Sequence, residues 1–328
     1  MSIALPHRVT VKEEGMRDGL QNEKAILPTE TKVEIINALL DTGLPRISVT
    51  SFAHPKWVPQ LQDGAEVLRR IRRAPGVTIV ALVPNLRGLE RAIAVKQEGV
   101  KLDEIDLVFS ASEGHNRSNV NKGVDESLAE MPGLIETAHG AGLAVNLTIS
   151  TAFGCAIDGV VPAERVIALA RRAHDGAPDM ITLGDTPGVA NPRQSYELFS
   201  RLREALPQAR LGAHFHDTRG TGLSNVLAAM QASIDSFDGC IGGIGGCPFS
   251  PGATGNVSTE DVVNMLHEMG IETGVDLSKL FDCARMMQKV LGRELPGRAM
   301  HAHATPCWPA AISPSLPSRP PAPGSGTR

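Results

Sequence analysis

The sequence Leu211-Gly-Ala-His-Phe-His-Asp-Thr-Arg-Gly220 has the pattern of a short strand that runs into a loop and then a helix. Side chains alternate between the two faces of a strand, so His214 and His216 point the same way and Phe215 points the other way. Two imidazoles on one face, with the carboxylate of Asp217 beside them, are typical of a divalent-metal site. The alternative is a pair of histidines satisfied by hydrogen bonds at a strand end. This stretch alone does not decide between the two.

Strand-like runs of this kind alternate with helix-like runs along most of the chain. The expected strands are at 8–13, 46–50, 77–83, 104–109, 144–149, 180–183, 211–216 and 233–237. The expected helices are at 28–43, 64–73, 86–97, 127–139, 163–174, 195–205, 223–232, 259–269 and 277–291. Such alternation predicts a parallel sheet, and eight units over roughly 290 residues fit a closed (β/α)8 barrel, or TIM barrel, with extra C-terminal helices.

The rival architecture is an open, doubly wound sheet. That fold usually carries a glycine-rich phosphate loop after its first strand, where this chain has Arg17 and Asp18. A barrel also accounts for the polar clusters that follow most of the strands, because these loops share one rim where active sites form.

The domain boundary is marked by a change in composition. We expect one barrel domain over residues 1–295 and a disordered tail over 296–328, because the end of the chain is rich in proline, serine and alanine. No catalytic role is expected for the tail.

Composition excludes several classes of partner. The net charge of −4 gives no footprint for nucleic acid or an anionic membrane surface, and no apolar run is long enough to cross a bilayer. The five cysteines show no paired spacing, so we expect free thiols in a reducing cytoplasm. We further expect a homo-oligomer of two or more subunits.

The candidate metal ligands are Asp18, His214 and His216. Two nitrogens and a carboxylate leave positions open for substrate oxygens and water, which suits Mg2+ or Mn2+. Asn256 could add a neutral oxygen. Taken singly, Asp18 could equally be a helix cap and Asn256 a turn residue.

Other polar residues on the same rim could act on a substrate. Arg17 could hold a carbonyl oxygen that becomes an enolate, or could simply pair with Glu13 or Asp185. Cys247 lies in the glycine-rich segment 242–256, where a thiol of lowered pKa could move a proton. Its alternative role is a small apolar residue in a loop.

Five ordered motifs resemble the hydroxymethylglutaryl-CoA lyase family, within the metal-dependent TIM-barrel lyase and synthase superfamily. They are Gly15-Met-Arg-Asp-Gly-Leu-Gln-Asn-Glu-Lys24, Pro55-Lys-Trp-Val-Pro-Gln60, Leu183-Gly-Asp-Thr186, His214-Phe-His-Asp-Thr218 and Gly243-Ile-Gly-Gly-Cys-Pro248 to Asn256. The resemblance covers about residues 8–290. It implies retro-Claisen cleavage of 3-hydroxy-3-methylglutaryl-CoA to acetyl-CoA and acetoacetate, with an acyl-CoA as the binding partner.

The resemblance also implies roles for particular residues. Asp18, His214, His216 and Asn256 become metal ligands. The catalytic set is Arg17 for the enolate, Cys247 for proton transfer, Glu260 in support, and Asp185. Read from the residues alone, Glu260 lies near a helix start, where a capping role is ordinary.

The chain departs from the family pattern most clearly at Ser48, where the family usually has glutamate, and it also has Met16 in place of proline. Either Asp185 or Glu13 takes over the pairing with Arg17, or the site is retuned for another acyl group. The unusually polar loop 112–119 favours retuning. Three alternative functions therefore stay open. The first is the same chemistry on another ester such as citramalyl-CoA. The second is a condensing acyltransferase, against which the presence of Cys247 argues, and the third is a metal-binding paralogue without catalytic activity, suggested only by Ser48.

Overall fold

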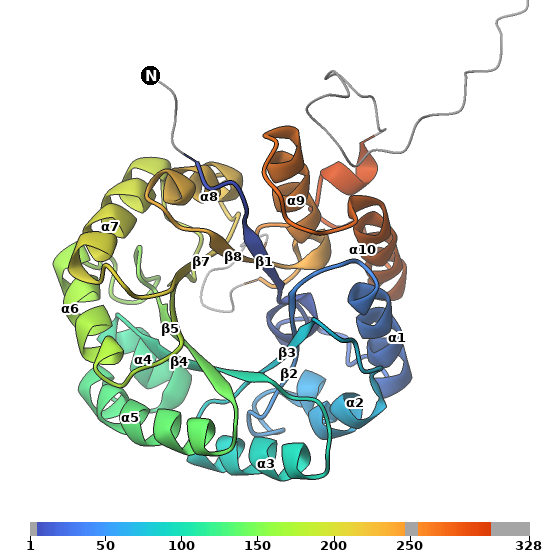
Figure 1. Ribbon diagram of the computed structural model, residues 1–328, viewed down its shortest axis with the longest axis horizontal. Coiled ribbons are helices and arrows are strands. Elements are labelled where there is room, and N and C mark those ends of the chain that lie inside the picture. Colours follow the sequence, from blue (N-terminus) through green and yellow to red (C-terminus); the bar gives the residue numbers. More distant parts are fainter. Residues whose placement is uncertain (1–4, 247–254, 303–328) are drawn as a thin grey trace, which may run out of the picture.

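A computed structural model describes residues 5–246 and 255–302 of the chain. All eight strands pair in parallel in sequence order, and β1 pairs with β8 to close the barrel (Figure 1). The strands are β1 Thr10–Glu13, β2 Arg46–Ser51, β3 Thr78–Leu82, β4 Glu104–Ser110, β5 Ala144–Ser150, β6 Met180–Asp185, β7 Leu211–Phe215 and β8 Ser236–Gly239. The expected (β/α)8 barrel is confirmed, and the open sheet is excluded.

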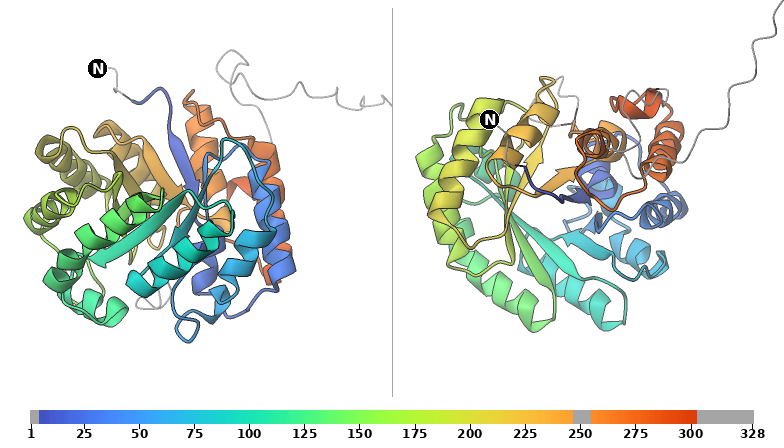
Figure 2. Two further views of the ribbon diagram at one scale, coloured as in Figure 1. Left: turned by 60° about the horizontal axis from the view of Figure 1, so that its bottom comes forward. Right: turned by 45° about the horizontal axis from the view of Figure 1, so that its top comes forward.

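Helices surround the barrel on its outside (Figure 2). They are α1 Thr29–Leu40, α2 Gly64–Arg70, α3 Leu86–Gln97, α4 Glu113–Val120, α5 Val124–Gly140, α6 Ala163–His174, α7 Pro192–Ala205, α8 Gly222–Gln231, α9 Thr259–Glu268 and α10 Leu277–Leu291. Short helical turns are η1 Gly15–Gly19, η2 Pro59–Leu61, η3 Ile241–Gly243 and η4 Ala299–His301. The extra C-terminal helix α10 packs between α9 and α1.

The apolar core lies between the strands and the helices. In α6, Val166, Leu169, Ala170 and Ala173 are buried, at the spacing that places them on one face, while Arg171 and Arg172 are exposed. The outward residues of the strands are aliphatic and fully buried, as in Ile47, Ile79, Ile105 and Val145. Burial of this apolar layer is the dominant favourable term in folding.

The interior of the barrel is charged rather than apolar. Lys12 of β1 contacts Asp106 of β4 at 3.1 Å, and Arg46 of β2 contacts Glu104 of β4. These pairs join strands that are not neighbours, so their side chains cross the inside of the barrel. Inward positions of such barrels are more often filled with branched aliphatic residues.

Two local expectations are wrong. Residues 113–120 form helix α4, where a polar loop was expected, because the Ser112 hydroxyl caps its first turn by accepting from the His115 amide. Asn121 ends this helix in the left-handed region, with φ of 57°. Strand β8 begins at Ser236 rather than at residue 233, because Ser233 has φ of 63° and closes a turn.

No helix in the described ranges has both the length and the apolar character that spanning a bilayer requires.

The packed domain extends beyond the expected boundary at 295. The amides of Arg298 and Ala299 donate to the Asp261 carboxylate in α9, at 3.0 and 2.6 Å, and Met300 is buried. Residues 296–302 are therefore part of the barrel domain and not of a tail, while the remainder of the predicted tail, 303–328, lies outside the described residues.

Two truncations test this boundary. A chain ending at Leu295 loses the Asp261 contacts and the burial of Met300, so its free energy of unfolding should fall by about 2 kcal/mol. A chain ending at Ala302 retains both and should melt at the full-length temperature in a calorimetric scan. Equal melting temperatures for the two truncations would contradict the assignment.

Candidate active site

The predicted metal ligands converge at the carboxyl end of the barrel. Asp18 lies in η1, the helical turn that follows β1, and His214 is in β7. His216 follows β7 and forms an isolated bridge with Asn256, which lies shortly before α9. Segments from the two ends of the barrel sequence therefore meet, because β1, β7 and β8 are neighbours in the closed sheet.

The three strongest ligands form one compact cluster. The Nε2 atoms of His214 and His216 are 3.2 Å apart, and they lie 3.9 and 4.0 Å from Asp18 Oδ2. One ligand atom from each residue lies within 4.8 Å of the others. Two imidazole nitrogens and a carboxylate in this arrangement can hold a divalent ion and leave coordination positions open.

Asn256 is placed to complete the set. Its amide nitrogen donates to Asp18 Oδ2 at 2.8 Å, whereas its buried Oδ1 has no hydrogen-bond partner among the described residues. An unsatisfied buried oxygen is unfavourable unless a ligand, water or ion supplies a partner. The amide oxygen beside Asp18 thus fits a fourth ligand for a hard cation.

The charges at the mouth also fit a divalent cation. One buried network joins the cations of Lys12, Arg17 and Arg46 to the carboxylates of Glu14, Asp18, Glu104, Asp106 and Asp238. With the histidines neutral, the carboxylates exceed the cations by two. Buried charge of this kind requires compensation, which a bound dication supplies.

Asp238 of β8 orients the first histidine, a role that the sequence analysis missed. Its Oδ2 lies 3.2 Å from His214 Nδ1, which leaves Nε2 of that ring facing the cluster. Burial lowers the pKa of His214, but the hydrogen bond to Asp238 and the charge of Asp18 outweigh it and raise the pKa overall. A carboxylate behind a ligating histidine fixes its orientation and increases its basicity.

For His216 the effects of its surroundings lower the pKa instead of raising it. Burial, followed by the neighbouring His214, lowers its pKa to about 4. Its imidazole is therefore neutral near pH 7, the state in which a ring nitrogen can bind a metal.

Arg17 pairs with Asp18 and with a residue that was not predicted. Its Nη1 lies 2.6 Å from Asp18 Oδ1, and its Nη2 lies 2.5 Å from Glu14 Oε2. Glu13 and Asp185, the partners offered as one of two alternatives, form no ion pair with Arg17 among the described residues. Glu13 instead accepts hydrogen bonds from the amides of Gly15 and Ile241, at 2.6 and 3.0 Å.

Asp185 and Glu260 are buried, and no hydrogen bond or ion pair between described residues joins either of them to the metal cluster. Asp185 accepts from the amides of Val189 and Ala190 at 2.9 and 3.1 Å, and burial raises its pKa to about 6. Glu260 accepts from the Gly242 amide at 3.0 Å, and burial raises its pKa to about 7.

Glu260 is not the cap of α9. Ser258 has that role, since its hydroxyl accepts from the Asp261 amide at 3.3 Å. Glu260 holds the backbone of Gly242, which has φ of 66°, at the start of the segment that leads toward Cys247. Cys247 itself lies outside the described residues.

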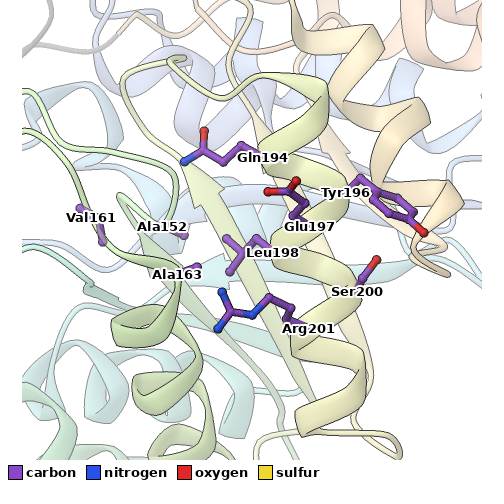
Figure 3. Close-up of a pocket in the computed structure, with 9 residues that line it drawn as sticks. All are labelled: Ala152, Val161, Ala163, Gln194, Tyr196, Glu197, Leu198, Ser200 and Arg201. Carbon is purple, nitrogen blue, oxygen red and sulfur yellow. The ribbon is translucent and has the colours of Figure 1, made fainter.

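A separate hollow of about 290 Å3 lies on the outer ring of helices, beside α7 (Figure 3). Its lining includes Ala163 at the start of α6 together with Tyr196, Glu197 and Arg201 of α7. Neither Arg17 nor any residue of the metal cluster lines it, so it is separate from the site described above.

The fold and the site together define a (β/α)8-barrel protein with a cluster able to hold a divalent metal ion at the carboxyl end of its strands. The chain matches the HMGL-like family over residues 8–287. It is 46% identical over 293 residues to hydroxymethylglutaryl-CoA lyase YngG of Bacillus subtilis, covering 89% of this chain and 96% of that protein. It is 39% identical to the mitochondrial hydroxymethylglutaryl-CoA lyase of Gallus gallus, covering 91% and 99%.

Solved structures agree. The crystal structure of the Bacillus subtilis HMG-CoA lyase superimposes with a TM-score of 0.87 at 44% identity, covering 90% of this chain and 98% of that one. An HMG-CoA lyase from Acinetobacter baumannii, in complex with coenzyme A and 3-methylmalate, gives 0.86 at 39% identity, covering 94% and 99%. The chain belongs to the HMGL-like family, a metal-dependent family.

Removal of one ligand should abolish most metal binding. We expect His214→Ala and Asp18→Ala to weaken Mn2+ binding by at least ~100-fold, because too few strong donors remain. Isothermal titration of the metal-free proteins measures this directly.

His267→Ala is the matched control, because His267 is half-buried in α9, contacts Thr273 and is not part of the cluster. Wild-type Mn2+ affinity in His214→Ala would show that the cluster is not the metal site.

Proposed function

We propose that this chain is a lyase that cleaves 3-hydroxy-3-methylglutaryl-CoA to acetyl-CoA and acetoacetate. The observation that carries the proposal is the convergence of Asp18, His214 and His216 beside Arg17 at the barrel mouth, in a member of the HMGL-like family. Proteins that are similar to it over nearly their whole length are named as lyases of this ester.

The reaction requires loss of the substrate's 3-hydroxyl proton and rupture of the bond between C2 and C3. The electron pair of that bond passes to the thioester as an enolate, and C3 becomes the ketone carbon of acetoacetate. Mg2+ or Mn2+ held by Asp18, His214, His216 and Asn256 would supply Lewis acidity, which acidifies a coordinated hydroxyl and polarises a carbonyl oxygen.

Arg17 is assigned to the enolate oxygen. Two of its nitrogens are held by Glu14 and Asp18, whereas its buried Nε has no acceptor among the described residues. A fixed cationic donor of this kind stabilises negative charge that develops during the reaction.

Asp185 is assigned as the base that takes the hydroxyl proton. It follows Gly184, which is the register partner of His214 in the neighbouring strand. Its pKa of about 6, raised by burial, suits proton exchange near neutral pH. Cys247 is assigned to protonation of the enolate, and Glu260 to the support of the glycine-rich segment that carries this cysteine.

The same proposal extends to the setting of the enzyme. Cys155, Cys240 and Cys283 are buried free thiols, which fits a reducing cytoplasm. Assembly into a homo-oligomer of two or more subunits stays a prediction, for which sedimentation velocity is the direct measurement.

A panel of CoA esters tests the activity. With Mg2+ present, the wild-type protein should release acetyl-CoA and acetoacetate from hydroxymethylglutaryl-CoA faster than it cleaves citramalyl-CoA. Arg17→Gln should lower kcat by about 10²- to 10³-fold, because a charged donor to the enolate is lost. Faster cleavage of citramalyl-CoA would move the assignment to that ester, and release of CoA from acetyl-CoA plus a 2-oxoacid would identify a condensing enzyme.

Cys247 has its own test. Cys247→Ser should lower kcat by about 10²-fold or more, because a hydroxyl is a far weaker acid than a thiol. Cys283→Ala, a change at a buried thiol of α10 that has no assigned role in the reaction, serves as the control. Full activity of Cys247→Ser would remove this residue from the mechanism.

A further inference from the structure

We propose that Glu14 is the residue that positions Arg17 for catalysis, and that it performs in this chain the task that an acid at position 48 would otherwise perform. The inference rests on the proposed function and extends it to a residue outside the predicted catalytic set.

Glu14 is held between two cations. It is fully buried, with Oε2 2.5 Å from Arg17 Nη2 and Oε1 2.7 Å from Lys12 Nζ. Each oxygen therefore has its own positive partner. Both contacts are ion pairs without hydrogen-bond geometry, so Glu14 acts on Arg17 through its buried negative charge, and the Nε of Arg17 has no acceptor among the described residues.

Lys12 connects the Glu14–Arg17 pair to the residues around the metal cluster. Its ammonium lies 3.1 Å from Asp106 Oδ2 and 3.4 Å from Asp238 Oδ2, and Asp238 in turn orients His214. The position of Glu14 is thus fixed from inside the barrel by Lys12, which also contacts Asp238 behind His214.

Ser48 and Glu14 lie at corresponding ends of the β1–β2 register. Lys12 pairs with Arg46 and Glu13 with Ile47 across β1 and β2, and Glu14 and Ser48 are the next residue after each of the last two partners. Alternation along β2 directs Ser48 to the same side as Arg46, and the contact between Glu14 and Lys12 at 2.7 Å places Glu14 on the side of Lys12. An acid at either position would therefore reach the same region.

Ser48 itself contributes nothing visible to the network. It is fully buried, and its hydroxyl has no partner among the described residues. The β2–β3 register shifts immediately after it, between Ser48 and Thr50. A buried hydroxyl without a partner is unfavourable, so Ser48 has no role in holding Arg17.

Charge balance favours an acid at position 14 or at position 48, but not at both. The network already has two more carboxylates than cations, which one dication neutralises. A second acid at position 48 would leave one negative charge uncompensated and would compete with Asp18 and Glu14 for Arg17. The structure thus favours compensation by Glu14 over retuning of the site for another acyl group.

Four proteins test the exchange: wild type, Glu14→Gln, Ser48→Glu and the double variant, each assayed on the ester that the wild type cleaves best. Glu14→Gln should lower kcat by about 10²-fold with little change in KM, because Arg17 is released. Ser48→Glu alone should lower kcat by ~10-fold, and the double variant should return to within about 3-fold of wild type, since one acid again serves Arg17.

Mn2+ titration gives a readout independent of turnover. Glu14→Gln should bind Mn2+ ~10-fold more weakly and Ser48→Glu should bind it more tightly, because the net charge near the ion changes in opposite directions. The double variant should recover wild-type affinity. A role limited to folding would not produce tighter metal binding together with slower turnover.

Controls separate the possible failures. Glu14→Gln combined with Ser48→Gln should give no recovery, because no acid is present. If Glu14→Gln does not fold, Glu14→Asp should fold and show an intermediate kcat. A double variant no better than its worse parent in both kcat and Mn2+ affinity overturns the inference. If the wild type cleaves no ester, the proposed function fails. The Mn2+ titrations then test by themselves whether an acid at position 48 can replace the one at position 14.

Discussion

The charge balance inside the barrel mouth is the constraint on which the site depends. Buried ions are tolerated only when each has a close partner of opposite sign. Lys12 satisfies this condition for three carboxylates at once, at 2.7, 3.1 and 3.4 Å. The surplus of negative charge then lies next to His214 and His216, so the same balance that makes the interior tolerable also creates the affinity for a dication.

Much of the fold and part of the site could be predicted from sequence. The alternation of strands and helices follows from local hydrophobic periodicity, and the His214–Phe215–His216 spacing places both histidines on one strand face. Both features can therefore be predicted without knowledge of the tertiary structure. The partner of Arg17 could not be obtained in this way. Only Glu13 and Asp185 were named as acids near a strand end, and it is the end of β1 at Glu13 and the start of η1 at Glu14 that bring Glu14 to Arg17.

Two other misses have similar causes. Asp238 could have been found by noting that it alternates with Ser236 in the last strand, but the strand was placed three residues too early. The polar character of residues 113–120 indicated a loop, whereas the capping hydroxyl of Ser112 and the left-handed Asn121 stabilise a helix there. The stabilisation from capping at both ends of α4 outweighs the small amount of apolar surface that this helix can bury.

The closure of the barrel also determines when the site can exist. Asp18 follows the first strand and Asn256 follows the last, and the two side chains are in contact although they are 238 residues apart in sequence. Contacts of such long range form late, because the entropy lost in closing the loop comes before the contact is made. A chain emerging from the ribosome holds Asp18 from the outset but has no ion-binding cluster until β7 docks and β1 meets β8. Assembly of this cluster is therefore tied to completion of the fold, because a partly made chain cannot bring its four residues together.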